Sequence, residues 1–456
     1  MRSLAARGVN DGLVLLIGNA ESSMNYTDNT YPFRQDSSFL YFFGQALSCL
    51  AGSIDLASGR STLYGDDLSM DDIVWTGPEP SVAELARAVA ADEARPRGAL
   101  GAAVSAKAVS AKAAKKAPLL WLPPYRDETR RELAELTGLR LAEVDAGASL
   151  DLVRAALSLR EVKEPREVAE LETAVATTVA MHRDALALAR PGMREYDIAA
   201  AVTARALAGG GGLSFPVIAT THSSVLHNHR YAGILREGGL FLLDAGAETA
   251  SGYAGDLTTT FPIGKTFDDR QRAVYEIVLA MGKAAQPLVK PGTPFAAAHD
   301  AAALACAAGL VSLGIMRGDP VEASRLGAHA LFFPHGLGHQ IGLDVHDMEN
   351  YGERWVGYDG AERSTQFGRA SLRLGKALRP GMVHSIEPGI YFIPELIASW
   401  KAERRFAEFI DYEALAGFLP VGGIRNEEDW LVTETGGRRL GPDFDKSAAA
   451  IESARR

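Results

Sequence analysis

Cysteine is almost absent from this sequence. Cys49 and Cys306 are the two cysteines among 456 residues. They are too few and too far apart in the chain for a disulfide framework or a structural zinc site built on thiolates. A reducing compartment is therefore the expected setting, and we predict a cytoplasmic protein.

The sequence also lacks a surplus of basic charge. Acidic residues outnumber basic ones by 57 to 47, which gives a formal net charge of -10. Most of such a surface would repel a phosphate backbone. The composition therefore argues against a nucleic-acid-binding protein.

Long apolar runs are missing as well. The first apolar run, Leu13–Ile17, is short and is closed by Gly18, so it predicts a strand and not a signal sequence. No run approaches the roughly 18 apolar residues that a membrane span requires. We therefore expect a soluble protein without an export signal.

The apolar residues that are present can form a large core. They make up 47% of the chain, and a chain of this length usually divides into two or more domains. The mixed pattern up to about residue 152 predicts a small α/β domain, and a charged stretch follows it. We place the domains at residues 1–159 and 160–456. Within the first, the Ala/Lys-rich segment 102–116 predicts a surface insertion or an exposed helix, with a basic contact patch as the alternative.

The second domain combines helices with short strands that do not alternate regularly with them. This pattern predicts an α+β domain in which helices cover one face of a curved antiparallel sheet. The stop signal Pro191-Gly192 ends the first long helix. The helices are expected at residues 165–190, 195–208, 269–288 and 294–313, and the strands at 214–219, 240–244, 253–261, 382–393 and 423–433.

Three of the ten histidines lie within twelve residues, in the run FPHGLGHQIGLDVHD at residues 333–347. The interval from His335 to His339 is typical of a helical metal pair, but Pro334 and the neighbouring glycines weigh against a helix. Glycine lets backbone approach a ligand closely. We therefore expect an irregular loop or strand with a metal or catalytic role; the alternative is three separately satisfied buried histidines.

Four carboxylates occur beside apolar, strand-like runs. They are Asp244 in LFLLDAG, Asp256 in YAGDLTTTF, Glu387 in HSIEPGIY and Glu427 in GGIRNEEDW. Each could cap a turn, but an ionised group beside buried residues is costly unless a cation or donors compensate it. Together without a cation they would repel by about 4 kcal/mol per pair at roughly 4 Å and an effective dielectric near 20. Two divalent cations would neutralise all four.

An oxygen-rich ligand set with one imidazole suits manganese, cobalt or zinc. Paired ions about 3.5–4 Å apart commonly activate a shared water. The sequence therefore predicts two divalent metal ions per chain, most simply manganese.

The ordered set Asp244, Asp256, His339, Glu387 and Glu427, with its surrounding motifs, resembles the pita-bread metallopeptidases, and within them the proline-specific branch of aminopeptidase P and prolidase. The run YPFRQDSSFLYFFG at residues 31–44 resembles the N-terminal domain of that branch. The resemblance covers most of the chain. One departure is the interval between the two aspartates, which is one residue longer than in the family and puts an extra residue in the turn.

The resemblance implies a role for each matching residue. Asp244 would hold one metal and His339 and Glu387 the other, while Asp256 and Glu427 would bridge them around a hydroxide that attacks the peptide carbonyl carbon. Glu387 would shuttle the proton to the leaving proline nitrogen. The residues expected to contact the substrate or shape the site are His227, His335, His346 and Arg425.

The resemblance leaves two branches open. The N-terminal motif and the STQFG and GGIRNEED blocks favour an Xaa-Pro aminopeptidase, which acts on peptides longer than two residues. Arg373 matches an arginine that prolidases use for the carboxylate of a dipeptide, although it could equally form a surface ion pair, and the insertion Asn350–Arg369 is prolidase-like. We expect the aminopeptidase, with Xaa-Pro dipeptidase as the alternative.

Two further readings are less well supported. The first is a non-catalytic pita-bread scaffold that binds peptides or proteins, which would not need the intact ligand set. The second is a carbon–nitrogen hydrolase that acts on a small non-peptide substrate, as in creatinase-like relatives, which lack that set. Family resemblance also implies a homodimer or homotetramer that acts on proline-containing peptides.

Overall fold

The computed structural model describes residues 1–114 and 119–455. The chain divides into two compact units, Met1–Arg160 and Glu161–Arg456. Each unit is described by itself below.

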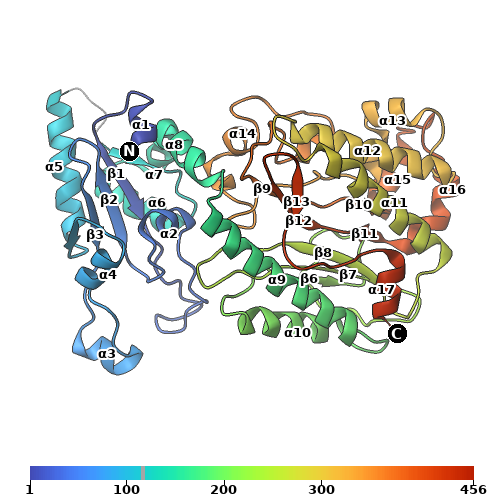
Figure 1. The fold of residues 1–456 in the computed structure, drawn as a ribbon, viewed down its shortest axis with the longest axis horizontal. Coiled ribbons are helices and arrows are strands. Elements are labelled where there is room, and N and C mark those ends of the chain that lie inside the picture. Colours follow the sequence, from blue (N-terminus) through green and yellow to red (C-terminus); the bar gives the residue numbers. More distant parts are fainter. Residues whose placement is uncertain (115–118, 456) are drawn as a thin grey trace. The chain divides into compact units, whose positions relative to one another are not determined.

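The first unit is built around a mixed sheet, which has five strands in its described part, in the order β4-β3-β2-β1-β5 (Figure 1). β1 is antiparallel to β2 and parallel to β5, and all five of its residues are buried, as in a strand covered on both faces. The strands are β1 (Leu13–Ile17), β2 (Ala51–Asp55), β3 (Ser61–Tyr64), β4 (Glu93–Arg95) and β5 (Leu119–Trp121).

Helices surround this sheet. The longest, α5, contributes Leu100 and Val104 to the core of the unit. The predicted surface insertion at 102–116 is thus a helix as far as Ala114, partly packed into the core, and residues 115–116 lie outside the described residues. The helices are α1 (Arg2–Ala5), α2 (Ser37–Phe43), α3 (Met70–Thr76), α4 (Val82–Ala88), α5 (Ala99–Ala114), α6 (Asp127–Thr137), α7 (Leu141–Ala146) and α8 (Leu150–Arg160).

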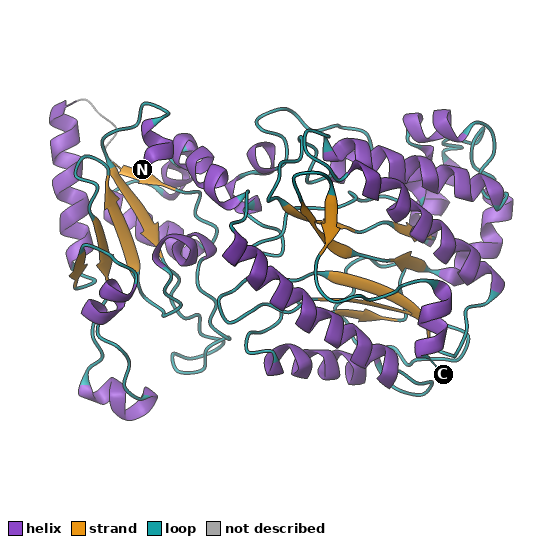
Figure 2. Ribbon diagram, in the orientation of Figure 1, coloured by secondary structure: helices purple, strands orange, loops and turns teal. Residues whose placement is uncertain are grey.

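The second unit contains short antiparallel sheets with helices on their outer side (Figure 2). This confirms the expected α+β architecture. One sheet has the order β6-β7-β8, a second β13-β12-β9, and a third pairs β10 with β11. The strands are β6 (Ile218–Thr220), β7 (Leu240–Ala245), β8 (Leu257–Pro262), β9 (Val383–Ile386), β10 (Gly389–Tyr391), β11 (Gly423–Arg425), β12 (Glu428–Val432) and β13 (Gly437–Arg439).

The helices cover these sheets in two groups. The pair α9 and α10 packs on β6, β7 and β8, whereas α11 packs on β10 and β11 and pairs with α12. The helices are α9 (Pro165–Leu188), α10 (Glu195–Ala208), α11 (Asp269–Ala285), α12 (Phe295–Ser312), α13 (Pro320–Leu326), α14 (Glu353–Val356), α15 (Pro394–Ala402), α16 (Tyr412–Leu415) and α17 (Ala448–Ala454), with 3-10 turns η1 (Gln286–Leu288), η2 (Ala328–Leu331), η3 (Glu349–Tyr351), η4 (Arg369–Ser371) and η5 (Ala416–Val421).

Helix α12 is the most apolar of the long helices among the described residues. It is 18 residues long with a mean hydropathy of 1.4, so length and composition alone would let it cross a membrane. Its buried side chains, among them Phe295, Ala302 and Leu310, belong to the core cluster of the second unit. The apolar composition of the helix is accounted for by that packing.

Two of the predicted strands are interrupted at the residues of chemical interest. The segment expected at 382–393 divides into β9 and β10 on either side of Glu387, and that at 423–433 divides into β11 and β12 on either side of Glu427. Pro388 has no amide hydrogen to donate to a ladder. Both glutamates therefore lie between strands. The alternation of side chains along a pleated strand does not fix the direction of their side chains.

Candidate active site

The strand pairing brings the predicted ligands together. Asp244 on β7 is paired with Thr258 on β8, and Thr258 is bridged to Glu427. Directly paired residues of antiparallel strands share a face of the sheet. Asp244, Thr258 and Glu427 therefore form a row across β7, β8 and the segment that joins β11 to β12, with side chains on one face.

The β7–β8 hairpin keeps one register from the pair Asp244–Thr258 to the bridge Glu248–Ala254. Side chains alternate along each strand, so residues an even number apart on an unbroken hairpin share a face. In the observed register Asp256 lies opposite Gly246, which is two residues from Asp244, so Asp256 is on the same face as Asp244. The longer interval is accommodated in the turn beyond the bridge.

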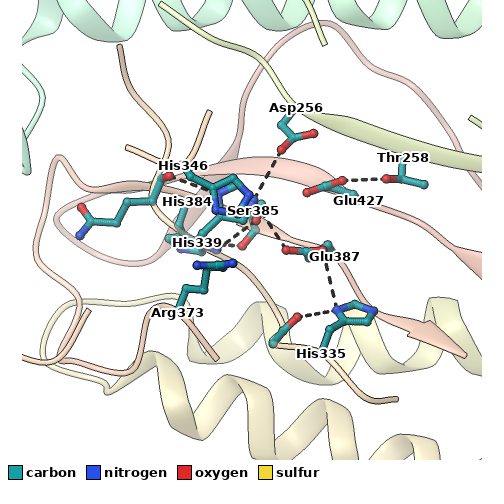
Figure 3. Close-up of polar contacts among 12 residues, drawn as sticks. Asp256, Thr258, His335, His339, His346, Arg373, His384, Ser385, Glu387 and Glu427 are labelled. Atoms are coloured by element: carbon teal, nitrogen blue, oxygen red, sulfur yellow. Dashed lines mark hydrogen bonds and ion pairs between the residues drawn. The ribbon is translucent and has the colours of Figure 1, made fainter. Parts of the chain in front are cut away.

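His339 reaches the same point from an irregular loop, as expected from its glycines. Its Nε2 lies 3.5 Å from Asp256 Oδ2 and 3.6 Å from Glu387 Oε1 (Figure 3). Ligand atoms of Asp256, His339 and Glu427 all lie within 4.8 Å of one another. A Cβ at Gly338 would come within 2.2 Å of the Ser385 carbonyl oxygen, so glycine is needed for this approach.

The carboxylates strongly perturb one another. Burial, followed by the charge of Glu427, raises the pKa of Asp256 well above its usual range, and burial with Glu427 does the same for the pKa of Glu387. Burial and the charge of Asp244 raise the pKa of Glu427 to about 7. A neighbouring cation, or hydrogen bonds donated to the carboxylates, would stabilise such groups as anions.

Asp244 Oδ1 and Asp256 Oδ1 are two buried oxygen atoms of the cluster that have no hydrogen-bond partner among the described residues. Buried carboxylate oxygens are rarely left unsatisfied. The donor set of carboxylates and one imidazole is one that divalent cations accept. The residues present therefore fit a metal centre.

The other oxygen of Asp244 is held by Arg425. Arg425 Nη2 donates to Asp244 Oδ2 at 2.5 Å, its Nη1 donates to the Tyr391 hydroxyl at 2.7 Å, and its Nε donates to Thr258 Oγ1 at 3.1 Å. Thr258 Oγ1 in turn donates to Glu427 Oε2 at 2.7 Å. Arg425 thereby fixes the side of the cluster that Asp244 occupies.

His335 lies beside Oε2 of Glu387, whereas His339 lies beside Oε1 of the same carboxylate. Its Nδ1 is 3.8 Å from Glu387 Oε2, and its Nε2 is 3.0 Å from the Tyr391 hydroxyl. Burial, followed by the charge of Arg425, lowers the pKa of His335 to about 3. A neutral imidazole therefore contacts Glu387.

His346 lies against His339, the predicted ligand histidine. The rings of His339 and His346 are stacked with centroids 3.8 Å apart and planes inclined by 12°. His346 Nδ1 is 3.0 Å from Glu349 Oε1, which leaves Nε2 for another partner.

His227 belongs to a loop that a buried glutamate anchors at both ends. Glu195 Oε1 accepts hydrogen bonds from the Thr221 amide and hydroxyl at 2.6 and 2.8 Å, and its Oε2 accepts one from the Gly233 amide at 2.8 Å. Burial, followed by the charge of Arg425, lowers the pKa of His227. Nothing in the sequence marks Glu195 as functional, because one acid at the start of an amphipathic helix is typical of a helix terminus.

Further charged residues that sequence reasoning missed support the loop of His339 and His346. Lys163 Nζ lies 3.0 Å from Asp347 Oδ2, and Gln340 Nε2 donates to Glu161 Oε1 at 3.2 Å. Asp429 Oδ2 accepts a hydrogen bond from the Asp256 amide at 2.9 Å. In the sequence these residues are charged residues within charged stretches. Many solvent-exposed residues have the same pattern, so it does not indicate a buried role.

A cavity of about 640 Å³ opens onto the cluster. Apolar side chains such as Phe215, Leu226 and Phe367 form part of its wall. The ten residues that the sequence analysis selected all line it: His227, Asp244, Asp256, His335, His339, His346, Arg373, Glu387, Arg425 and Glu427. One chamber thus combines metal-binding groups, imidazoles and an arginine.

Comparison with known proteins agrees with this arrangement. Residues 169–434 match the model of metallopeptidase family M24, and residues 1–114 match the aminopeptidase P N-terminal domain. A probable Xaa-Pro aminopeptidase of Emericella nidulans is 30% identical over 445 residues, which is 96% of this chain and 88% of that protein. A human Xaa-Pro dipeptidase is 31% identical over 435 residues, 93% of this chain and 85% of the relative.

Solved structures give the same assignment. The aminopeptidase PepP of Pseudomonas aeruginosa superimposes with a TM-score of 0.81 at 26% identity, covering 100% of this chain and 96% of that one. Aminopeptidase P of Escherichia coli with the inhibitor Pro-Leu gives a TM-score of 0.79 at 27% identity, covering 100% and 97%. The predicted resemblance is confirmed, and the chain belongs to metallopeptidase family M24.

Proposed function

We propose that this protein is an Xaa-Pro aminopeptidase, which hydrolyses the bond between the first residue of a peptide and a proline in second position. The observation that carries the proposal is the single cavity lined by the carboxylates, His339 and the substrate-facing candidates. Relatives named Xaa-Pro aminopeptidase and structures of aminopeptidase P along nearly the whole chain support it.

The metal ligands in this proposal are Asp244, Asp256, His339, Glu387 and Glu427. Two divalent cations bound there supply Lewis-acid polarisation of the substrate carbonyl and an activated water. The oxygen-rich donor set favours manganese, with cobalt and zinc as alternatives. Asp256 and Glu427 are the proposed bridging ligands.

The remaining residues handle protons and orientation. Glu387 takes a proton from the attacking water and delivers it to the proline nitrogen, which is a tertiary amide and must be protonated as it leaves. The neutral His335 lies beside it, with Nδ1 at 3.8 Å from Glu387 Oε2 and bound to the Gly336 carbonyl oxygen at 2.8 Å. As an imidazolium, with Nδ1 donating to Glu349, His346 would have an Nε2–H that donates to the carbonyl oxygen as charge develops there. His227 contacts the substrate from the loop anchored by Glu195.

An Xaa-Pro dipeptidase is the second candidate, because Arg373 lines the cavity and the human relative at 31% identity carries that name. The two are separated by comparing manganese-loaded protein on an Xaa-Pro dipeptide and an Xaa-Pro-Xaa tripeptide. Tripeptide cleavage at least as efficient as dipeptide cleavage supports the aminopeptidase. Negligible tripeptide cleavage would establish the dipeptidase.

We further place the protein in the cytoplasm as a homodimer or homotetramer acting on proline-containing peptides. Both cysteines are free thiols in the structure, which suits a reducing compartment. Light scattering on purified protein tests the oligomeric state.

A further inference from the structure

Arg373 does not present a free positive charge to the cavity that it lines. Its Nη1 donates to Glu349 Oε2 at 2.8 Å and to Glu353 Oε1 at 2.6 Å. The other oxygen of Glu353 is paired with Arg363. Two guanidinium groups and two carboxylates thus form a cluster whose formal charges cancel.

Glu349 has a second partner in the site. Its Oε1 contacts His346 Nδ1 at 3.0 Å, while its Oε2 accepts from Arg373. His346 and Arg373 both line the cavity, whereas Glu349 lies behind them with its side chain mostly buried. One carboxylate therefore joins the imidazole at the substrate carbonyl to the arginine farther along the cavity.

This arrangement decides what kind of substrate the arginine can bind. A peptide carboxylate would meet a guanidinium that already holds two carboxylates, and three anions around one cation repel one another. A charge-assisted pair with the substrate would also have to replace contacts of the same kind. A chain that continues beyond proline presents a neutral amide at this point and meets no such repulsion.

We infer that Glu349, together with Glu353, is a specificity-determining residue that disfavours substrates with a free carboxylate on the second residue. The pair neutralises Arg373 and directs the enzyme toward peptides longer than two residues. This inference rests on the proposed function, since it concerns substrate choice at the same site.

The test uses two substrates with the same scissile bond, an Xaa-Pro dipeptide and the corresponding Xaa-Pro amide. In wild type, the amide is expected to be cleaved more efficiently. Glu349→Gln keeps an acceptor for His346 but removes the charge that neutralises Arg373. We expect it to raise the ratio of kcat/KM for dipeptide over amide on the order of tenfold, the scale of one hydrogen bond to a charged group. Any effect through His346 acts on both substrates and cancels in the ratio.

Further variants isolate the cause. Glu353→Gln does not touch His346 and should raise the same ratio, whereas Arg373→Ala combined with Glu349→Gln should abolish the gain. Glu362→Gln, an exposed acid in the same segment, is the matched control and should leave the ratio unchanged. Thermal unfolding verifies that each variant folds.

The outcomes separate this inference from the proposed function. An unchanged ratio in both Glu349→Gln and Glu353→Gln, or a wild-type preference for the dipeptide over its amide, would overturn the inference. Absence of cleavage of the amide and of any Xaa-Pro peptide by manganese-loaded wild type would overturn the proposed function as well.

Discussion

Lys163 and Asp347 form an ion pair across 184 residues of sequence, with Nζ 3.0 Å from Oδ2 and each side chain only 1% exposed. Asp347 follows His346 directly, and it packs so closely on Gly342 that a Cβ there would lie 2.2 Å from its Oδ2. The pair therefore attaches the beginning of the second unit to the loop that carries His346.

Breaking this pair should destabilise the protein strongly. Lys163→Met leaves the Asp347 carboxylate buried without its cation, and removing one partner of a buried pair typically costs about 3–5 kcal/mol. Urea denaturation measures the loss. Lys401→Met, which removes an exposed pair with Glu413, is the control and should change the free energy of unfolding by less than about 1 kcal/mol. Equal losses in both variants would show that burial does not increase the contribution of the Lys163–Asp347 pair to the free energy of unfolding.

The metal centre should hold about two divalent ions per chain, because four carboxylates and one imidazole provide charge and donors for a pair. Asp256→Asn and Glu427→Gln, at the proposed bridges, should each lose both ions and the activity. Elemental analysis after dialysis counts the metal. Asp443→Asn, at an exposed carboxylate, should retain both ions. Full metal content with full activity in either bridge variant would refute the bridging assignment.

His346 should affect turnover and not metal content. It stacks on His339 but is assigned to the substrate carbonyl, so His346→Ala should lower kcat by roughly a hundredfold or more, as for other donors to a developing oxyanion. Metal analysis should give the wild-type value. Unchanged turnover, or loss of metal, would assign another role to this imidazole.

Stability should fall in acid because of buried neutral histidines outside the metal cluster. Burial lowers the pKa of His182 to about 3, and burial with the neighbouring His329 lowers that of His299 to about 3, from an ordinary value of 6.5. Below pH 6.5 the unfolded chain binds protons that these folded imidazoles do not, so each removes up to about 1.4 kcal/mol per pH unit.

Urea denaturation at pH 7, 6 and 5 measures this slope. In metal-loaded protein, whose cations would keep the carboxylates of the cluster ionised, the free energy of unfolding should decrease from pH 7 to pH 5, and His182→Gln should make the decrease shallower. A variant with the wild-type slope would mean that His182 does not contribute to it.

The sequence allowed the long helices and the ligand set to be predicted, for physical reasons that can be named. Helix α9 begins at Pro165 and was expected to end at Pro191-Gly192, close to the observed end at Leu188, because proline and glycine act through the local backbone. Each predicted ligand lies inside a distinctive motif, so its neighbours in sequence indicate it. Both kinds of signal come from residues that are adjacent in the sequence.

The parts that could not be predicted depend on partners distant in sequence. Glu349 lies in an irregular segment, and nothing near it indicates contacts with both His346 and Arg373. Arg373 left two readings open, and its two glutamate partners became visible only in the folded structure. The interruptions at Glu387 and Glu427 were missed because apolar residues flank both, and an apolar run predicts a continuous strand.

The position of Glu161 limits how the catalytic unit can be produced alone. This residue is buried against Lys376 and Arg379 and accepts a hydrogen bond from Gln340, although it precedes the family match, which begins at residue 169. A recombinant fragment trimmed to that match would lose both Glu161 and Lys163, and with them the carboxylate that Lys376 and Arg379 share and the buried cation paired with Asp347. A fragment intended to fold must therefore begin upstream of Glu161.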